Sequence, residues 1–287
     1  MSALPADLRF SRRGSGGVML DCAEAGPQDG PLVFLLHGCP EFWFGWREQI
    51  GALAAAGFLV VAPDQRGYNK SDKPKGIAQY DLDCLAGDVV GLADAYGRNS
   101  FSLVGHDWGG SVAWWTASLH PDRVRRLAVL NAPHPAIWKN AMENDPAQSR
   151  LSAYVKFIAF PYLPEFVLRL TGNRGLVYAL RQSRHPPKES DLARYRAAWA
   201  EPGALTAMLN WYRALLQRPL PPDQQRRITM PACLIWGRQD PYAIADLAEA
   251  SIALCDHGAV VWMNEATHWV QHDEPERVNR ILLEFLK

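Results

Sequence analysis

Short apolar runs alternate with helical patterns along most of this 287-residue chain, and few architectures are compatible with that order. Each run has the length of a strand, and the stretch between successive runs is long enough for a crossover helix. The six runs cover residues 32–36, 58–62, 101–104, 127–130, 232–236 and 259–262. A segment at residues 18–23 precedes them and is expected to form an antiparallel edge. The pattern therefore predicts an α/β fold with a mostly parallel central sheet and flanking helices.

The strand pattern is interrupted once, between Pro135 and about Pro222. This stretch has helical character and is too long for a structureless loop. Because ligands bind at the carboxyl edge of open α/β sheets, we expect the insertion to form a lid there. The chain is accordingly divided into a core in two parts, residues 1–135 and 223–287, and an inserted helical cap, residues 136–222.

The charge and cysteine content argue against several kinds of partner. Thirty Lys and Arg residues balance thirty Asp and Glu residues, so no overall field attracts nucleic acid or an anionic membrane. No apolar run approaches the length of a membrane span, and residues 1–10 lack the apolar core of a secretory signal. The five cysteines have no paired metal-binding spacing, so we expect free thiols in the cytoplasm. Whether the chain forms a homodimer is left open.

The hexapeptide GHDWGG, residues 105–110, directly follows one of the predicted strands and precedes a predicted helix. The candidate nucleophile has one small residue two positions before it and another two positions after it. This spacing is typical of a sharp strand-to-helix turn that exposes the nucleophile. Gly105 and Gly109 permit such a turn because they carry no Cβ. The central residue is Asp107, where serine is usual. Taken alone, this aspartate is better explained as the N-cap of the helix.

Two further residues, which lie much later in the chain, favour a catalytic role for Asp107 over a capping role. Asp240 follows the strand at residues 232–236, and His268 follows the strand at residues 259–262. An enzyme built on this turn supplies an acid and then a histidine, in that order, from loops after later strands. The two side chains are therefore expected to converge on Asp107.

The loop His37-Gly38-Cys39-Pro40 follows the first parallel strand. In enzymes with this turn, one backbone N–H of that loop and the N–H of the residue after the nucleophile form an oxyanion hole. The expected donors are Cys39 and Trp108, because Pro40 has no N–H.

A carboxylate nucleophile indicates a particular reaction. Unlike a serine hydroxyl, Asp107 is ionised at neutral pH without the help of a base. It can attack a saturated carbon that carries a leaving group, which forms an ester. His268, oriented by Asp240, would then activate a water molecule that attacks the Asp107 carbonyl. The residues therefore favour alkyl-transfer hydrolysis over ordinary ester hydrolysis.

Five segments, in this order, carry a resemblance to a known family: HGCPEFW, APDQRGYNKSD, VGHDWGG, NAPHP and HWVQHDEP. From about Gly16 to Lys287 the chain resembles the epoxide hydrolases of the α/β-hydrolase superfamily. The resemblance implies a core sheet with a helical cap, an aspartate nucleophile, a cis peptide before Pro40, and no cofactor. It also implies two cap tyrosines that protonate the epoxide oxygen. The segments YVKFIAFPYLPEF and LNWYRALL place these at Tyr154 and Tyr212.

The chain departs from the family pattern near the expected substrate pocket. Cys39 replaces an aromatic residue, Phe42 replaces a small polar residue, and Ala159 stands where glutamine is frequent. Phe42 and Trp43 are expected to line the pocket. With the aromatic cap, they favour a small apolar or aryl epoxide, with water as the second substrate.

Haloalkane and fluoroacetate dehalogenases are the main alternatives, because they use the same chemistry of Asp, His and acid. Haloalkane dehalogenases often have an asparagine in the loop where this chain has Cys39. Fluoroacetate dehalogenases typically have an arginine where this chain has Trp108. A serine esterase would need a Gly-x-Ser-x-Gly turn, which the sequence lacks. A non-catalytic binding module is disfavoured because all three catalytic positions are filled. His268 and His272 have helical spacing, but no third ligand suggests a metal site.

Overall fold

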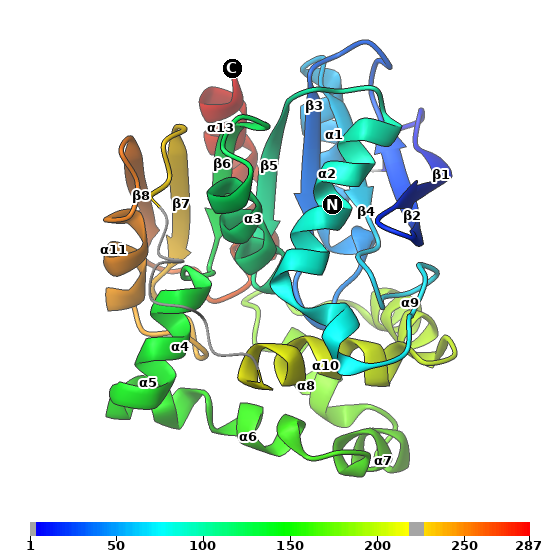
Figure 1. Ribbon diagram of the computed structural model, residues 1–287, viewed down its shortest axis with the longest axis vertical. Helices are drawn as coiled ribbons and strands as arrows, with labels where there is room; N and C mark the ends of the chain where they lie inside the picture. Colours follow the sequence, from blue (N-terminus) through cyan, green and yellow to red (C-terminus); the bar gives the residue numbers. More distant parts are fainter. Residues whose placement is uncertain (1–3, 218–226) are drawn as a thin grey trace.

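An eight-stranded sheet in the order β1-β2-β4-β3-β5-β6-β7-β8 forms the centre of the computed structural model, which describes residues 4–217 and 227–287 (Figure 1). Strands β1 and β2 pair antiparallel with each other, and β2 pairs antiparallel with β4. Strands β3 to β8 are parallel to one another. The strands are β1 Arg9–Ser15, β2 Val18–Ala25, β3 Leu32–Leu36, β4 Leu59–Pro63, β5 Phe101–His106, β6 Val124–Leu130, β7 Ala232–Gly237 and β8 Gly258–Met263. The predicted α/β fold is therefore confirmed.

The edge of the sheet differs from the prediction. The segment predicted as the edge is β2, and β1 pairs outside it along its whole length. In β1, more exposed side chains alternate with less exposed ones, and its sequence RFSRRGS is mostly polar. A strand with one solvated face contains no continuous apolar run, which is the signal that identified the central strands.

Helices cover both faces of the sheet. Helices α2 Leu82–Ala95 and α3 Trp108–Leu119 pack on one face, and α1 Arg47–Ala55 and α13 Pro275–Leu286 pack together on the other (Figure 1). The remaining core elements are the 3₁₀ helices η1 Trp43–Trp46 and η2 Ile77–Tyr80, and the helices α11 Asp246–Ile252 and α12 Val270–Asp273. None of the helices in the described ranges is long and apolar enough to cross a membrane.

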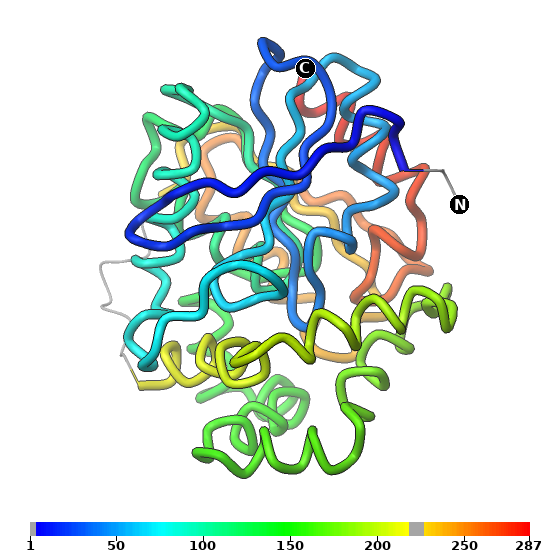
Figure 2. Tube along the Cα trace, turned by 90° about the vertical axis from the view of Figure 1, so that its right-hand side faces the viewer, coloured from blue at the N-terminus to red at the C-terminus, as the bar shows by residue number. Residues whose placement is uncertain are grey.

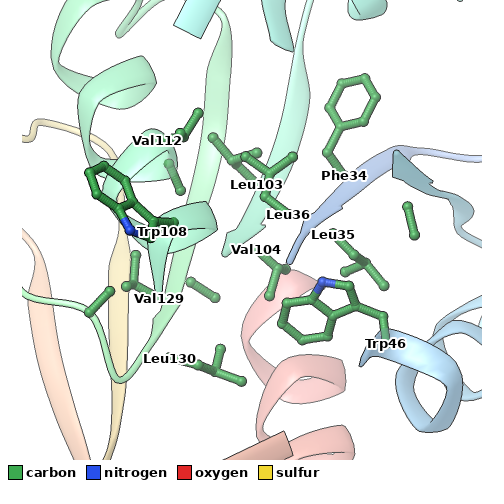
Figure 3. Close-up of a cluster of buried hydrophobic side chains, with 14 of the residues drawn as sticks. Phe34, Leu35, Leu36, Trp46, Leu103, Val104, Trp108, Val112, Val129 and Leu130 are labelled. Carbon is green, nitrogen blue, oxygen red and sulfur yellow. The ribbon is translucent and has the colours of Figure 1, made fainter. Parts of the chain in front are cut away.

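The central strands are buried on both faces. Every residue of β3 and β5 is buried, as expected for inner strands of a parallel sheet. The apolar side chains labelled in Figure 3 come from β3, β5, β6, η1 and α3, and pack into one cluster. Trp108, at the first position of α3, belongs to this cluster, so the core fixes where the helix begins. All five cysteines are free thiols, as predicted.

Within the described residues, seven helices lie between β6 and β7, beyond one end of the sheet (Figures 1 and 2). They are α4 Pro135–Asn144, α5 Pro146–Leu151, α6 Ala153–Ala159, α7 Leu163–Leu170, α8 Arg174–Leu180, α9 Glu189–Ala200 and α10 Ala204–Gln217. The stretch is helical, as expected of a cap. Its expected end at Pro222, with the Pro221-Pro222 pair, lies outside the described residues.

A buried ion pair holds three cap helices together. Arg213 of α10 donates to both carboxylate oxygens of Glu165 in α7, at 2.7 and 3.0 Å. The same guanidinium donates to the carbonyl oxygens of Ile158 in α6 and of Phe160. Such a forked contact fixes the planes of both side chains. Helix α6, which carries Tyr154, is therefore tied to α10, which carries Tyr212.

Candidate active site

Three strand ends bring the predicted triad together. Asp107 joins β5 to α3, Asp240 follows β7, and His268 follows β8. The Nδ1 atom of His268 lies 2.8 Å from Oδ2 of Asp240, and its Nε2 atom lies 3.4 Å from Oδ2 of Asp107. All three side chains therefore meet at the carboxyl edge of the sheet.

The turn at Asp107 is as sharp as its glycines suggested. Asp107 has a φ of 52°, in a region that non-glycine residues rarely adopt. A Cβ on Gly105 would lie 2.3 Å from the Gly109 carbonyl oxygen, so a side chain there is excluded. The Asp107 side chain makes no capping hydrogen bond to α3, although it occupies the N-cap position. The structure thus gives no support to a purely capping role for this residue.

The loop after β3 approaches Asp107 closely. The Cys39 N–H donates to Oδ1 of Asp107 at 2.7 Å. A Cβ on Gly38 would lie 2.5 Å from Cβ of Asp107, so only glycine permits this approach. The peptide between Cys39 and Pro40 is cis, which confirms what the family resemblance implied. Trp108 opens α3, and the N–H groups of a first helical turn have no acceptor within the helix.

Asp240 is held by a set of donors that includes one residue the sequence analysis did not assign. The Asn131 side chain donates to Oδ2 of Asp240 at 2.7 Å, and the N–H groups of Tyr242 and Ala243 donate to Oδ1 at 2.7 and 3.2 Å. Asn131 also accepts from and donates to the backbone of Gly237 at the end of β7. Asp240 is therefore fixed as an acceptor toward His268. Asn131 lies in the NAPHP segment, which carried the family resemblance.

The triad carries two negative groups around one histidine. Burial alone would lower the pKa of His268, but the carboxylates of Asp240 and Asp107 outweigh it and raise this pKa to about 10. Burial would raise the pKa of Asp107, but the contact with His268 holds it below its usual range. At neutral pH, the side chains are therefore an imidazolium between two carboxylates.

The loop that follows β3 leads into a further buried carboxylate, Glu41. It accepts from the Tyr195 hydroxyl at 2.7 Å and from the Gln271 amide at 3.1 Å, and lies 2.8 Å from Nε2 of His272. Burial would raise the pKa of Glu41, but His272 and His106 hold it well below its usual range. Glu41 thus connects the loop to α9 of the cap and to α12. His272 belongs to this network.

The two predicted cap tyrosines line the same cavity as Asp107. The side chains of Tyr154 and Tyr212 line it together with Asp107 and His268. The ring centroids of the two tyrosines are 6.1 Å apart, and that of Tyr212 lies 4.9 Å from that of Trp108. Burial raises the pKa of both hydroxyls well above the usual value, so both are protonated at neutral pH.

The cavity has a volume of about 310 Å³ and is mostly apolar. Its floor is formed by core residues near the triad, and its walls by helices α6, α7, α8 and α10. The apolar wall residues from α6 to α8 are Phe157, Ile158, Pro164, Leu168, Leu176 and Ala179. A third tyrosine, Tyr242, also lines the cavity, with its ring 5.0 Å from that of His268.

Phe42 and Trp43, which were expected to line the pocket, are not among the residues that line this cavity. Phe42 packs against Phe44 and the cap residue Tyr195, and Trp43 packs against Phe10 of β1. After Pro40 the chain turns into η1, away from the triad, so both rings are buried in the core. That expectation is corrected here. The pocket walls come from the cap instead.

The described ranges contain no group of three His, Cys, Asp or Glu side chains that could hold a metal ion. Both ring nitrogens of His268 lie against carboxylates of the triad. The side chains at the site are therefore arranged for nucleophilic and acid–base chemistry.

Comparisons with known proteins agree with this geometry. A family model described as the alpha/beta hydrolase fold matches residues 31–275. The AB hydrolase superfamily protein YfhM of Bacillus subtilis is 43% identical over 275 residues, which cover 95% of this chain and 96% of that protein. A Mus musculus protein named epoxide hydrolase 4 is 33% identical, covering 97% of this chain and 79% of that one. The crystal structure of a Bacillus megaterium epoxide hydrolase in complex with an inhibitor matches with a TM-score of 0.87 and 30% identity, covering 96% and 99% of the two chains.

Proposed function

The chain belongs to the alpha/beta hydrolase fold family, and we propose that it opens an epoxide to a vicinal diol through a covalent ester on Asp107. One observation carries this proposal. A carboxylate that is held by the Cys39 N–H and by His268 faces two protonated tyrosines, Tyr154 and Tyr212, across an apolar cavity. A nucleophile and acids on opposite sides of one space suit the opening of a neutral three-membered ring.

In the first step, an oxygen of Asp107 attacks an epoxide carbon, and the carbon–oxygen bond on the far side breaks. The departing oxygen takes a proton from Tyr154 or Tyr212. The tyrosinate that remains recovers a proton from the His268 imidazolium. The products of this step are an ester on Asp107, two neutral tyrosines and a neutral His268.

The ester changes the environment of His268. Asp107 no longer carries the negative charge that helped to raise the pKa of His268, so the imidazole is free to act as a base. It takes a proton from water as the water oxygen attacks the Asp107 carbonyl. The N–H groups of Cys39 and Trp108 stabilise the oxyanion that forms. When the ester bond breaks, the hydroxyl proton of the intermediate passes to the departing alkoxide, so the diol leaves and the Asp107 carboxylate and the His268 imidazolium are restored.

A dehalogenase would share the ester and its hydrolysis, so the acids of the cap distinguish the two functions. A halide leaves as a stable anion and needs no proton, whereas an epoxide oxygen leaves as a strongly basic alkoxide. The position of Tyr154 and Tyr212 in the cavity therefore favours the epoxide. Turnover of styrene-type epoxides, fatty-acid epoxides, chloroalkanes and fluoroacetate, measured side by side, would decide between these substrates.

The covalent step is tested with a His268→Gln variant. Without the base, the ester should form and persist, so intact-protein mass spectrometry should show the enzyme mass plus that of the whole epoxide. The control is Asp107→Asn, which should remain unmodified. An unmodified His268→Gln protein that is folded and still binds the epoxide would rule out the proposed mechanism.

A further inference from the structure

The outer side of helices α6 to α8 exposes apolar side chains that no other part of the described chain covers. Of the twelve large hydrophobic side chains that are exposed in the described ranges, eight lie between residues 154 and 178. Tyr162 is the most exposed of them, at 84%. We call these eight residues the cap face: Tyr154, Phe157, Phe160, Tyr162, Leu163, Phe166, Leu170 and Tyr178. An exposed apolar patch of this kind usually marks an interaction site.

The position of the cap face leaves it accessible. Helices α6 and α7 lie at the end of the molecule opposite the C-terminus, in both views (Figures 1 and 2). The sheet and its flanking helices lie on the other side of the cap. A flat partner can therefore approach the cap face without touching the core.

Charge on the cap face is strongly one-sided, although the whole chain is neutral. The exposed cations on its helices and on the segment that follows them are Lys156, Arg169, Arg174, Arg181, Arg184 and Lys188, of which Arg181 pairs with the exposed Glu189 of α9 at 3.7 Å. Between residues 153 and 188, the single acidic residue is Glu165, which is buried and paired with Arg213. Lys156, Arg169 and Arg174 have no acidic partner in the described part of the chain. The neutral total charge therefore conceals a local cationic field.

We propose that the cap face docks on an anionic lipid surface. Exposed aromatic and leucine side chains beside Lys and Arg are the combination that binds in the interface of a membrane, with the apolar groups among the acyl chains and the cations among the headgroups. A second copy of this chain fits less well, because two cap faces in contact would place like charges opposite each other. The expectation of no membrane partner rested on the total charge and on the lack of a membrane-spanning apolar run, and neither of these describes this surface.

The cavity and the cap face share three residues. Tyr154, Phe157 and Tyr178 line the cavity and are also exposed on the cap face. An apolar molecule that is dissolved in a lipid layer under the cap face would therefore reach Asp107 without crossing water. This consequence rests on the proposed function, whereas the docking itself does not.

The docking is tested by sedimentation of the full chain with vesicles of phosphatidylcholine alone or mixed with phosphatidylglycerol. Binding is expected with the mixed vesicles and should weaken as salt is added. The double variant Phe166→Asp/Leu170→Asp should lose at least about tenfold in partition coefficient. Arg169→Glu/Arg174→Glu should lose a similar factor, since each exposed cation near an anionic surface contributes roughly fivefold.

Matched controls come from the other end of the molecule. Phe10 is 61% exposed and Phe166 is 62% exposed, so Phe10→Asp alters an equally exposed ring outside the cap face. Arg125→Glu is the corresponding control for charge. Both controls should bind vesicles like the wild type. Phe166 and Leu170 of the cap face, and Arg169 and Arg174 beside it, do not line the cavity, so turnover of a water-soluble epoxide should also stay unchanged in both variants.

Three results would overturn the proposal: no binding to either vesicle, an equal loss of binding in the controls, or a dimer in solution that the Phe166→Asp/Leu170→Asp variant dissociates. The last result would assign the cap face to a second copy of the chain. A protein that binds vesicles but turns over no epoxide would leave the docking intact and count against the proposed function alone.

Discussion

The two walls of the cavity are built on opposite principles. On the core wall, Asp107 and His268 are polar, and their positions are fixed by hydrogen bonds to the Cys39 N–H and to Asp240, which follow the ends of strands. On the cap wall, the side chains are mostly apolar, and Phe157 and Tyr178 are 40% and 67% exposed. Charged groups that react must be held in place, whereas a wall that shapes a substrate needs only the right volume.

The cap itself shows the same contrast. Helices α9 and α10 are fastened to the core by buried indole groups, since Trp199 donates to the Pro40 carbonyl at 2.7 Å and Trp211 to the Arg66 carbonyl at 3.1 Å. Helix α7 is linked instead to α10 of the cap, through the contact of Glu165 with Arg213. We therefore expect substitutions on the core wall to change rates and stability. On the cap wall, substitutions of the two tyrosines should change the rate of alkylation, and substitutions of the apolar residues should change the handling of substrate.

The largest effect is expected for Asp240→Asn. Both oxygens of the Asp240 carboxylate accept hydrogen bonds, from Asn131, His268 and two backbone N–H groups. In an asparagine, the NH₂ group would replace one of these oxygens and would point at a donor instead of accepting from it. Steady-state turnover should fall by about 10⁴-fold, as it does in serine proteases when the acid of the triad becomes an amide. Asp246→Asn, at an exposed position on α11, should leave turnover unchanged. If Asp240→Asn kept more than a tenth of the activity, the orienting role would be wrong.

The next effect belongs to the cap wall. Tyr212→Phe alone should slow alkylation by roughly ten- to a thousand-fold, because Tyr154 remains as an acid. The double variant Tyr154→Phe/Tyr212→Phe should lose about 10²- to 10⁴-fold or more. Stopped-flow measurement of ester formation gives these rates directly.

The control is Tyr162→Phe, because this tyrosine is 84% exposed and does not line the cavity. Its alkylation rate should match that of the wild type. Full alkylation speed in a folded double variant would remove both tyrosines from the mechanism and favour the dehalogenase alternative.

A third prediction concerns stability and not rate. Glu41→Ala leaves the buried donors Tyr195, Gln271 and His272 without their acceptor, so the free energy of unfolding should fall by about 3–5 kcal/mol. Urea denaturation at pH 7 measures this. Glu189→Ala removes the carboxylate of an exposed ion pair and should change the free energy by less than about 1 kcal/mol.

The sign of the pH dependence follows from the lowered pKa of Glu41. Its contribution to stability should be complete above the unfolded value of about 4.3 and be lost as the pH falls through the folded pKa. The difference in stability between wild type and Glu41→Ala should therefore shrink at low pH. A difference that stayed constant down to acid pH would show that the charge of Glu41 does not matter.

The core wall was largely predictable from the sequence, and the reason is local. Asp107, Asp240 and His268 each lie at the turn or in the loop that follows an apolar run, and parallel strands end at one edge. Asn131 directly follows such a run too, but neither its role nor that of Glu41 could be read from its position, because each acts through a partner far along the chain. Asn131 meets Asp240 across 109 positions, and Glu41 meets His272 across 231.

The pocket wall was predicted less well. Aromatic composition pointed to Phe42 and Trp43, but composition does not tell on which side of a loop a ring will pack. Both rings are in the core, and the cavity is lined by helices of the cap. The edge strand β1 was missed for a related reason, since half of its side chains face solvent. Burial on both faces is what makes a sequence easy to interpret.

The smallest expected effect is a change in the pKa of His268. Burial lowers the pKa of His268, but the carboxylates of Asp240 and Asp107 have the larger effect and raise this pKa to about 10. Because the folded value lies above the ordinary value of about 6.5, the charged form stabilises the fold fully below that pH, and this stabilisation is lost as the pH rises through about 10. Asp107→Asn removes one of the two carboxylates, as the ester would, and should lower the pKa of His268. ¹⁵N NMR titration of the imidazole in wild type and variant measures both values, with His120, which lies outside the site, as an internal control. An unchanged His268 pKa would mean that Asp240 alone holds the proton, so forming the ester could not turn this imidazolium into a base.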